Sequence, residues 1–390
     1  MIPTAPGAAT LNTTVAKHPW QPEATVSTET LVVTAVVAAR FFVPLLIPRF
    51  PLPGVVAALV LDAADQSIFA AFGYDPPGYQ GYDKAMDVYY LAIAYMSTLR
   101  NWTSPQAYNV SRFLYFYRLV GVTAFELSGW RPLLLIFPNT FEYFFIAYEV
   151  VRARRNPARY SMRFWVWVAA VIWVFVKLPQ EWWIHIAQLD FTDELAAHPA
   201  LGPAIVVALL AAAAVYWWVV RPKLSPPAWP LRIAADPLPE QARTWQQRAV
   251  WTAQAGAWSA QVLEKVVLVG LIGVIYGEVL PGLDVTSFQL FCGLAVLVFV
   301  NAAAAVVIAR HRFGTDSALL AFAGRLVLNV GLVALARALV GGDRIDVRAA
   351  LFLVAMLSLI TFLHDRYLPV HDAREATAAP EGDVLRERVA

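Results

Sequence analysis

Residues 288–309 have the sequence FQLFCGLAVLVFVNAAAAVVIA, which contains no Asp, Glu, Lys or Arg. An uncharged apolar run of about 20 residues is long enough to cross the hydrocarbon core of a bilayer as a helix. The whole chain shares this character, because 59% of its 390 residues are hydrophobic and only 15% are charged. Soluble domains carry about 25% charged residues. The sequence therefore predicts an all-α integral membrane protein that crosses the bilayer several times.

Apolar runs of similar length recur along the chain, and we expect a polytopic bundle of about eleven transmembrane helices. They are residues 31–47, 54–72, 85–99, 113–128, 133–151, 164–184, 204–220, 262–280, 288–309, 319–340 and 349–363. The second and third segments are the least typical, because both contain acidic residues.

The charges in the connecting loops predict how these helices are oriented. Residues 152–163 contain five Arg and no acid, and residues 221–261 are also basic. Residues 185–203 contain three acids and neither Lys nor Arg. Because cytoplasmic loops are rich in Lys and Arg, the first two loops are predicted inside and the third outside. With eleven spans, this alternation places the N-terminus outside and the C-terminus in the cytoplasm.

Composition divides the chain into five parts. They are a polar N-terminal segment (1–28), transmembrane helices one to seven (29–220), a Pro-rich cytoplasmic linker (221–261), transmembrane helices eight to eleven (262–365) and a charged tail that we expect to be disordered (366–390). The first part lacks the basic-then-apolar pattern of a signal peptide. In the linker, Trp251 and Trp258 indicate either an interfacial helix or an extension of the eighth span.

Charged residues deep within the predicted spans are the best indication of a functional site. A charge at the centre of a transmembrane helix costs about 2.5–3.5 kcal/mol on insertion scales. The deep charges are Arg40, Asp62, Asp65, Glu142, Lys177 and Arg325. Because three are basic and three acidic, we expect them to pair in the interior of the bundle. They should meet on the second, fifth, sixth and tenth helices.

Two acidic pairs lie on the second and third helices. Asp62 and Asp65 project from one face, which also carries Gln66, and Asp83 and Asp87 lie one turn apart near the start of the next helix. Neighbouring carboxylates repel, which favours a shared proton or a bound cation and predicts a proton relay or an ion site. All four acids are candidate ligands of a divalent metal. The alternatives are neutralisation by a basic residue and simple capping of a helix end.

The sixth helix ends in a polar stretch on the outer side. Lys177, Glu181 and His185 are spaced by four residues and lie on one face, and Pro179 is expected to kink or break the helix between them. Glu181 and His185 are candidate catalytic residues together with Asp83 and Asp87, with His185 as a metal ligand or proton shuttle. The alternative is that His185 anchors the helix at the membrane interface.

Two further helices carry polar pairs. Glu142 lies near the middle of the fifth helix and shares a face with Glu149. On the tenth helix, Arg325 and Asn329 are one turn apart, and Arg325 is suited either to a phosphate or carboxylate or to an ion pair with Glu142. We include Glu142, Arg325 and Asn329 in the predicted substrate- or ion-binding set.

Several classes of function are excluded or left open by the sequence. The one cysteine, Cys292, allows neither an intramolecular disulfide nor a cysteine metal cluster. No phosphate-binding glycine loop or metalloprotease motif occurs, and the basic residues flank spans instead of forming a nucleic-acid surface. The abundance of Arg and Ala indicates a bacterial protein of the plasma membrane. The sequence identifies neither a cofactor nor an oligomeric state.

Three functions are consistent with these features. The first is a transporter or permease whose charged intramembrane site moves an ion or solute. The second is an intramembrane enzyme that acts on a lipid-linked or phosphate-bearing substrate at the outer leaflet, through an acid–base pair or a metal. The third is a structural partner in an envelope complex, in which the charges only join helices together.

Overall fold

The computed structural model describes residues 28–72, 79–189, 194, 195, 197–280, 282, 285–340 and 346–387. These residues form helices and connecting segments, and no strand occurs among them. The all-α class predicted from the sequence is therefore confirmed. The polar segment 1–28 lies outside the described residues, except for Thr28 at the start of the first helix.

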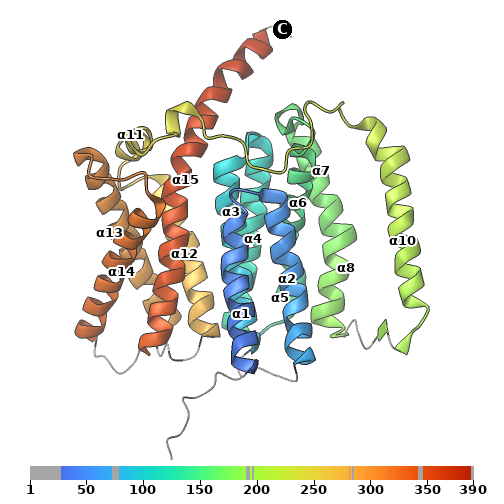
Figure 1. Cartoon of the computed structure of the whole chain (residues 1–390), viewed down its shortest axis with the longest axis horizontal. Coiled ribbons are helices and arrows are strands. Elements are labelled where there is room, and N and C mark those ends of the chain that lie inside the picture. The colour runs from blue at the N-terminus through green and yellow to red at the C-terminus, as the bar shows by residue number, and fades with distance from the viewer. Residues whose placement is uncertain are drawn as a thin grey trace, which may run out of the picture.

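Long helices, together with a few short ones, stand side by side and form the body of the molecule (Figure 1). In the first half they are α1 (Thr28–Phe42), α2 (Pro51–Ala71), α3 (Tyr79–Asn101), α4 (Pro105–Ser128), α5 (Pro132–Ile136), α6 (Thr140–Arg152), α7 (Met162–Ile172), α8 (Leu178–Glu181) and α10 (Leu201–Val215). In the second half they are α11 (Trp245–Ala255), α12 (Ala260–Val279), α13 (Ser287–His311), α14 (Ala318–Val340) and α15 (Val347–Glu387).

Six helical segments are long and apolar enough to cross a membrane. They are Pro132–Arg152, Met162–Ile186, Leu201–Lys223, Ser287–His311, Ala318–Ala338 and Ala349–Thr377. These segments support a multi-pass membrane protein. The count of about eleven spans and their orientation remain predictions, because α2, α3, α4 and α12 are not among these six segments of the described chain.

The helix that carries Pro179 is widened where the sequence predicts a break. Residues Trp173–Lys177 and Trp182–Ile186 form π-helical turns on either side of the short α8. A π turn accommodates the missing N–H of a proline without ending the helix. The chain therefore continues as one helix through Lys177 and Glu181, and both side chains are buried.

The core is centred on α3, the helix that contacts the largest set of neighbours. Its residues Tyr89, Ala92 and Tyr95 are completely buried, and α3 packs against α15 as well as α1 and α2. Close packing elsewhere depends on small residues, because Gly273 of α12 lies so near Leu294 of α13 that a Cβ would force the Leu294 side chain to move. Small residues allow transmembrane helices to approach closely.

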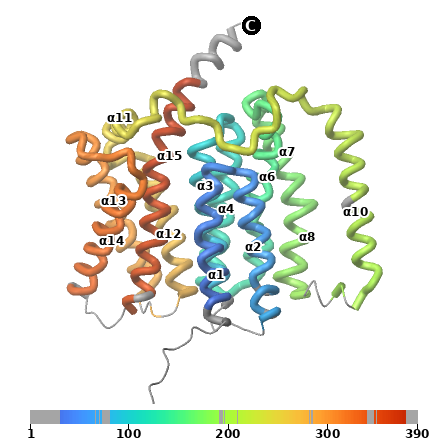
Figure 2. Tube along the Cα trace, in the orientation of Figure 1, coloured from blue at the N-terminus to red at the C-terminus, as the bar shows by residue number. Residues whose placement is uncertain are grey.

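The Pro-rich linker lies across one end of the bundle (Figure 2). It is held there by main-chain groups: Arg155 donates to the Ser225 carbonyl at 2.8 Å, and the Trp229 indole donates to the Arg152 carbonyl at 2.9 Å. Of the two alternatives for the segment before α12, the structure has a separate helix, α11. Gly256 ends it with a positive φ of 73°, so α11 is not an extension of α12.

The expectation of a disordered tail is corrected for its first part. The helix α15 continues past residue 366, and Val370 and Ala373 are buried against Ala242 of the linker. These apolar contacts offset the loss of conformational entropy on ordering, which a charged tail could not offset alone.

The candidate span Leu201–Lys223, which contains α10, is 0% buried over its apolar window. It stands at the edge of the bundle, next to the helix that contains α7 and α8 (Figure 1).

We predict that the linker end faces the cytoplasm, because its loops are the Arg-rich ones. In a Cys292→Ser background, a cysteine placed at Ala200, an exposed position before α10, should react with a membrane-impermeant maleimide in intact cells. A cysteine at Ala228, which is also exposed, should react only after the cells are opened. Labelling of Ala228→Cys but not Ala200→Cys in intact cells would show the opposite orientation.

Candidate functional site

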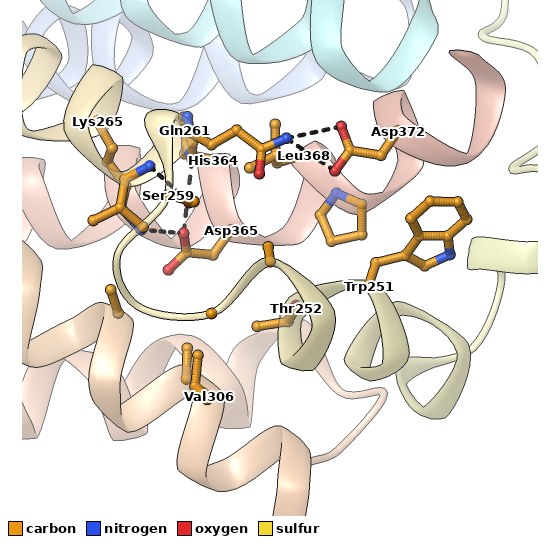
Figure 3. A pocket seen from close by; sticks show the side chains of 16 residues that line it. Trp251, Thr252, Ser259, Gln261, Lys265, Val306, His364, Asp365, Leu368 and Asp372 are labelled. Carbon is orange, nitrogen blue, oxygen red and sulfur yellow. Dashed lines mark hydrogen bonds and ion pairs between the residues drawn. The ribbon is translucent and has the colours of Figure 1, made fainter. Parts of the chain in front are cut away.

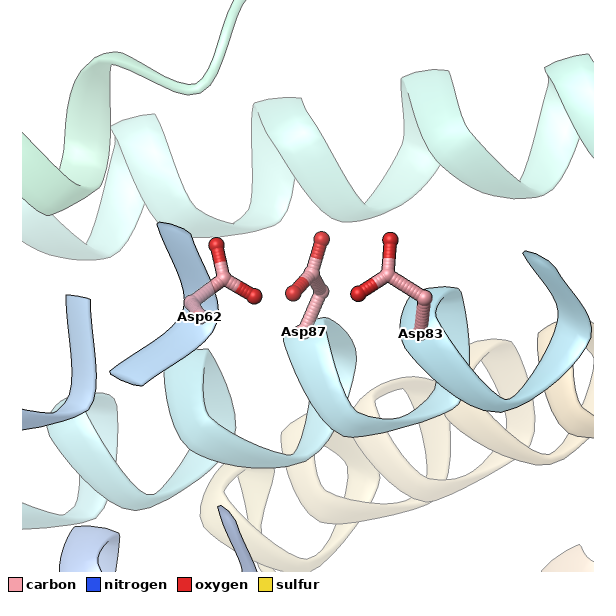
Figure 4. A group of neighbouring side chains, drawn as sticks. All are labelled: Asp62, Asp83 and Asp87. Carbon is pink, nitrogen blue, oxygen red and sulfur yellow. The ribbon is translucent and has the colours of Figure 1, made fainter. Parts of the chain in front are cut away.

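The candidate site forms where α1, α2 and α3 meet. Asp62 and Asp65 lie one turn apart on α2, and Asp83 and Asp87 lie one turn apart on α3. The two helices bring their acidic faces together, and the carboxylates of Asp62, Asp83 and Asp87 gather in one place (Figure 4). We call these four residues the Asp cluster. The sequence predicted the two acidic pairs and also proposed that a basic residue neutralises them.

Arg40 of α1 is that basic residue, and it bonds to all four carboxylates. Its Nη1 donates to Asp65 at 2.5 Å and to Asp83 at 2.6 Å. Its Nη2 donates to Asp87 at 2.8 Å and to Asp62. Each terminal nitrogen therefore holds one acid from α2 and one from α3, which uses the forked geometry that distinguishes Arg from Lys.

The exposure of these groups is uneven. The Arg40 side chain is 4% exposed and that of Asp65 is fully buried, whereas Asp62, Asp83 and Asp87 are 28%, 35% and 43% exposed. Arg40 and Asp65 form the interior of the site, and the other three acids form its accessible side. An ion that approaches the site would therefore meet carboxylates before it meets the guanidinium.

The site carries more negative than positive charge. One guanidinium faces four carboxylates, and like charges at such short range favour the binding of a proton or another cation. Asp62, Asp83 and Asp87 each offer an oxygen within 4.8 Å of the others, which is a spacing that a metal ion could bridge. Oxygen ligands of this kind suit hard cations such as Mg²⁺ and Ca²⁺.

A second polar group begins one turn further along α3. Tyr90, three residues after Asp87, donates to the Glu142 carboxylate of α6. The side chain of Asn139 donates to the other oxygen of Glu142 at 2.9 Å, and its backbone N–H donates to Glu181 at 3.0 Å. This chain of contacts leads from the edge of the Asp cluster towards the π-helical segment around α8.

Glu181 is the centre of that second group. Its carboxylate lies 3.5 Å from Lys177 Nζ, 3.0 Å from His185 Nε2 and 3.9 Å from Arg118 Nη1. The predicted face of Lys177, Glu181 and His185 is therefore formed despite Pro179. Glu181 is buried and surrounded by donors, whereas the His185 side chain is 25% exposed. Sequence reasoning missed Tyr90 and Arg118, because neither has an unusual spacing that would mark it.

The structure does not bring Arg325 to this site, which corrects the expectation that the deep charges meet at one place. Arg325 lies on α14, which packs on α15, and it pairs with Asp365 at 2.6 Å instead of Glu142. Lys265 holds the other oxygen of Asp365 at 2.5 Å. Asp365 was not recognised from the sequence because it falls just beyond the apolar part of the last predicted span.

Two other polar residues from the sequence analysis, Asn329 and Glu149, have local partners. The side chain of a third, Gln66, is not among the described ones. Asn329 links a buried amide to a buried hydroxyl. It accepts a hydrogen bond from the Asn301 amide at 2.6 Å and donates one to the Ser358 hydroxyl at 2.8 Å. Glu149 is held by Arg152 at 2.5 Å and by the Trp102 indole at 3.0 Å, which joins α6 to the end of α3.

We predict that Arg40→Gln destabilises the protein by about 3–5 kcal/mol, because it leaves the buried Asp65 and its neighbours without a cation. Thermal unfolding in detergent should show this as a large fall in Tm. Adding Asp65→Asn and Asp83→Asn to the variant should restore part of the loss.

The matched control is Arg112→Gln, which removes a guanidinium that is 49% exposed and pairs with Glu264. Exposed pairs contribute about 0–1 kcal/mol, so its Tm should change little. An Arg40→Gln protein as stable as the Arg112→Gln protein would contradict the account of Arg40 as the central counter-ion.

Comparison with models of known protein families, with curated proteins and with solved structures found no match for this chain. Its function is therefore argued from its own residues. Their arrangement describes a multi-pass membrane protein in which one buried arginine is shared by four carboxylates on two neighbouring helices.

Proposed function

We propose that the chain is a transporter that binds a proton or a cation at the Asp cluster and couples this binding to the movement of a solute. The observation that carries the proposal is the ratio of four carboxylates to one guanidinium at the centre of α1, α2 and α3. Charges in a transmembrane bundle usually mark ion or substrate pathways. The partial exposure of three of the acids supports exchange with the surroundings.

Arg40 acts in this proposal as a tethered internal cation. A proton or metal ion that binds to Asp83 or Asp87 weakens the bond of that acid to Arg40, because the two cations compete for the same oxygens. The guanidinium then bonds mainly to Asp62 and Asp65 on α2. This exchange changes the attraction between α1 and α3, and it provides a two-state element that ion binding can bias.

The second polar group extends the path along which a proton could move. Tyr90, Glu142 and Asn139 connect the neighbourhood of Asp87 to Glu181 through hydrogen bonds. Glu181 in turn contacts His185, whose side chain is partly exposed. Carboxylate, hydroxyl and imidazole groups are the usual components of a proton relay. Asn139 donates both of its hydrogen bonds, so its role is to position Glu142 and Glu181 and not to carry the proton itself. We assign the entry or exit of protons to this end of the path.

An enzyme is the second candidate, and one observation favours it. Three carboxylate oxygens within 4.8 Å of one another could hold a divalent cation, which would bind a phosphate-bearing lipid and polarise its phosphorus–oxygen bond. His185 and Glu181 would then be the acid and base on the same side. The purely structural alternative expects the charges to be fully buried between helices, and the partial exposure of Asp62, Asp83 and Asp87 at the surface of the bundle argues against it.

We predict that Asp87→Asn abolishes gradient-driven transport. Proteoliposomes containing the wild-type protein should accumulate at least one solute from a panel of amino acids, sugars, organic anions and metal ions when a pH or sodium gradient is imposed. The variant should lose this coupling, because one cation-binding oxygen pair is removed while the Arg40 bonds to the other acids remain.

The control is Glu278→Gln, which alters an exposed carboxylate that bonds to Ser287 at the end of α12. It should transport like the wild type. The transporter proposal fails if no solute moves in response to either gradient, or if Asp87→Asn moves it at the wild-type rate. Loss of tight Mn²⁺ binding in the same variant, with no transport by the wild type, would favour the enzyme.

A further inference from the structure

A cavity of about 350 Å³ lies at the linker end of the bundle, far along the chain from the Asp cluster. It opens between α13 and α14, which touch at few positions although they follow each other in sequence. α15 contributes Phe362 and Arg366 to its lining, and α11 contributes Trp245 and Arg248. The cavity is therefore enclosed by four helices at the level where the predicted cytoplasmic interface lies.

The polar lining is dominated by three arginines. Arg248, Arg325 and Arg366 line the cavity, and Asp365 is the one carboxylate among the residues that the structure assigns to it. Asp365 is already shared, because Lys265 binds one of its oxygens and Arg325 binds the other. The remaining acid nearby is Asp316, which is 58% exposed and 3.5 Å from Arg248. Three arginines of the cavity and Lys265 on the other side of Asp365 thus share two carboxylates.

The hydrogen-bonding groups of Arg325 are incompletely used, whereas Nη1 of Arg248 already donates to the carbonyls of Ala242 and Arg243. Nη1 of Arg325 is buried and has no hydrogen-bond partner within the part of the chain that the structure describes. Arg366 lies over the Phe362 ring at 5.9 Å. On α11, burial and then the nearby charge of Arg366 lower the pKa of Arg248. Two mutually repelling guanidinium groups and an unsatisfied buried N–H are the features of an anion site.

Asp365 separates this cavity from a smaller one on its other side. There Lys265 and His364 approach Asp365, and Gln261 holds Asp372 (Figure 3). Lys265 can therefore neutralise Asp365 from that side. This arrangement leaves the second nitrogen of Arg325 available to a ligand in the larger cavity.

Most of the rest of the larger cavity is apolar, although Thr252, Asn301 and Thr315 also line it. Its walls include Ala304 and Ile308 of α13 and Leu328 of α14, and Gly324 leaves open space where other residues would place a side chain. An anion site that continues into an apolar space between two apolar helices matches an amphiphilic ligand. Such a ligand has a charged head and a hydrocarbon tail. Basic pockets between transmembrane helices on the cytoplasmic side bind anionic lipid headgroups.

We propose that this cavity binds an anionic phospholipid, with the phosphate at Arg248, Arg325 and Arg366 and an acyl chain between α13 and α14. Arg provides bidentate donors that match phosphate oxygens. The adjoining α11 and Pro-rich linker lie at the same end of the bundle, which is the level expected for a headgroup (Figure 1). The proposal is independent of the transport function assigned to the Asp cluster.

The test is native mass spectrometry of the purified full chain in detergent, titrated with phosphatidylglycerol or phosphatidylcholine. The wild type should retain phosphatidylglycerol at least about tenfold more tightly, because only this lipid has a net negative headgroup that uses charge-assisted hydrogen bonds. Arg366→Gln should remove most of that preference while the ion pairs of Arg248 and Arg325 remain. Gly324→Leu should weaken binding by filling the apolar part of the cavity.

Two control variants match these changes at sites that do not line the cavity. Arg310→Gln removes an exposed arginine at the same end of α13, and Gly331→Leu adds a side chain to an exposed face of α14. Both should bind phosphatidylglycerol like the wild type. Equal affinity for the two lipids, or unchanged binding by both Arg366→Gln and Gly324→Leu, would overturn the proposal. Binding of glycerol phosphate as tightly as the lipid would overturn the acyl-chain part and indicate a soluble anion.

Discussion

Arg40 is the shared counter-ion on which the arrangement of α1, α2 and α3 depends. Each of its terminal nitrogens holds one carboxylate from α2 and one from α3, so a single side chain fixes three helices together. Moving these charges out of water costs several kcal/mol for each ion, which only close pairing can offset. The pairing is incomplete, because four acids share one cation. The same contacts that stabilise the bundle therefore leave a site that can accept another positive charge.

The remaining polar groups divide between the two ends of the molecule. Near the Asp cluster, Tyr90 and Glu142 continue the chain of polar contacts towards Glu181. At the linker end, the excess charge has the opposite sign, since the cavity beside α11 is lined by three arginines. The completely buried core of α3 lies between these regions and packs against α15. One end is thus suited to cations and the other to an anionic headgroup.

The membrane class and the acidic pairs could be predicted from the sequence, because both depend on local spacing along one helix. Which charges pair could not be predicted, since that depends on how helices pack. Arg325 pairs with Asp365 because α14 lies against α15, and no spacing in the sequence indicates that contact. The tail was expected to be disordered because of its charge, but Val370 and Ala373 find an apolar partner in the distant Ala242. Tyr90 became part of the site only through its contact with Glu142.

The central claim is that one guanidinium does not neutralise the four carboxylates around Arg40, so that they bind a further proton or cation. Infrared difference spectroscopy of the protein in lipid bilayers, with the pH changed over the same film, measures this directly. The account predicts a band of protonated carboxylic acid that disappears as the pH rises or as a binding cation is added, and that is reduced in Asp87→Asn. A spectrum without such a band, unchanged by pH and by every cation tested, would contradict it.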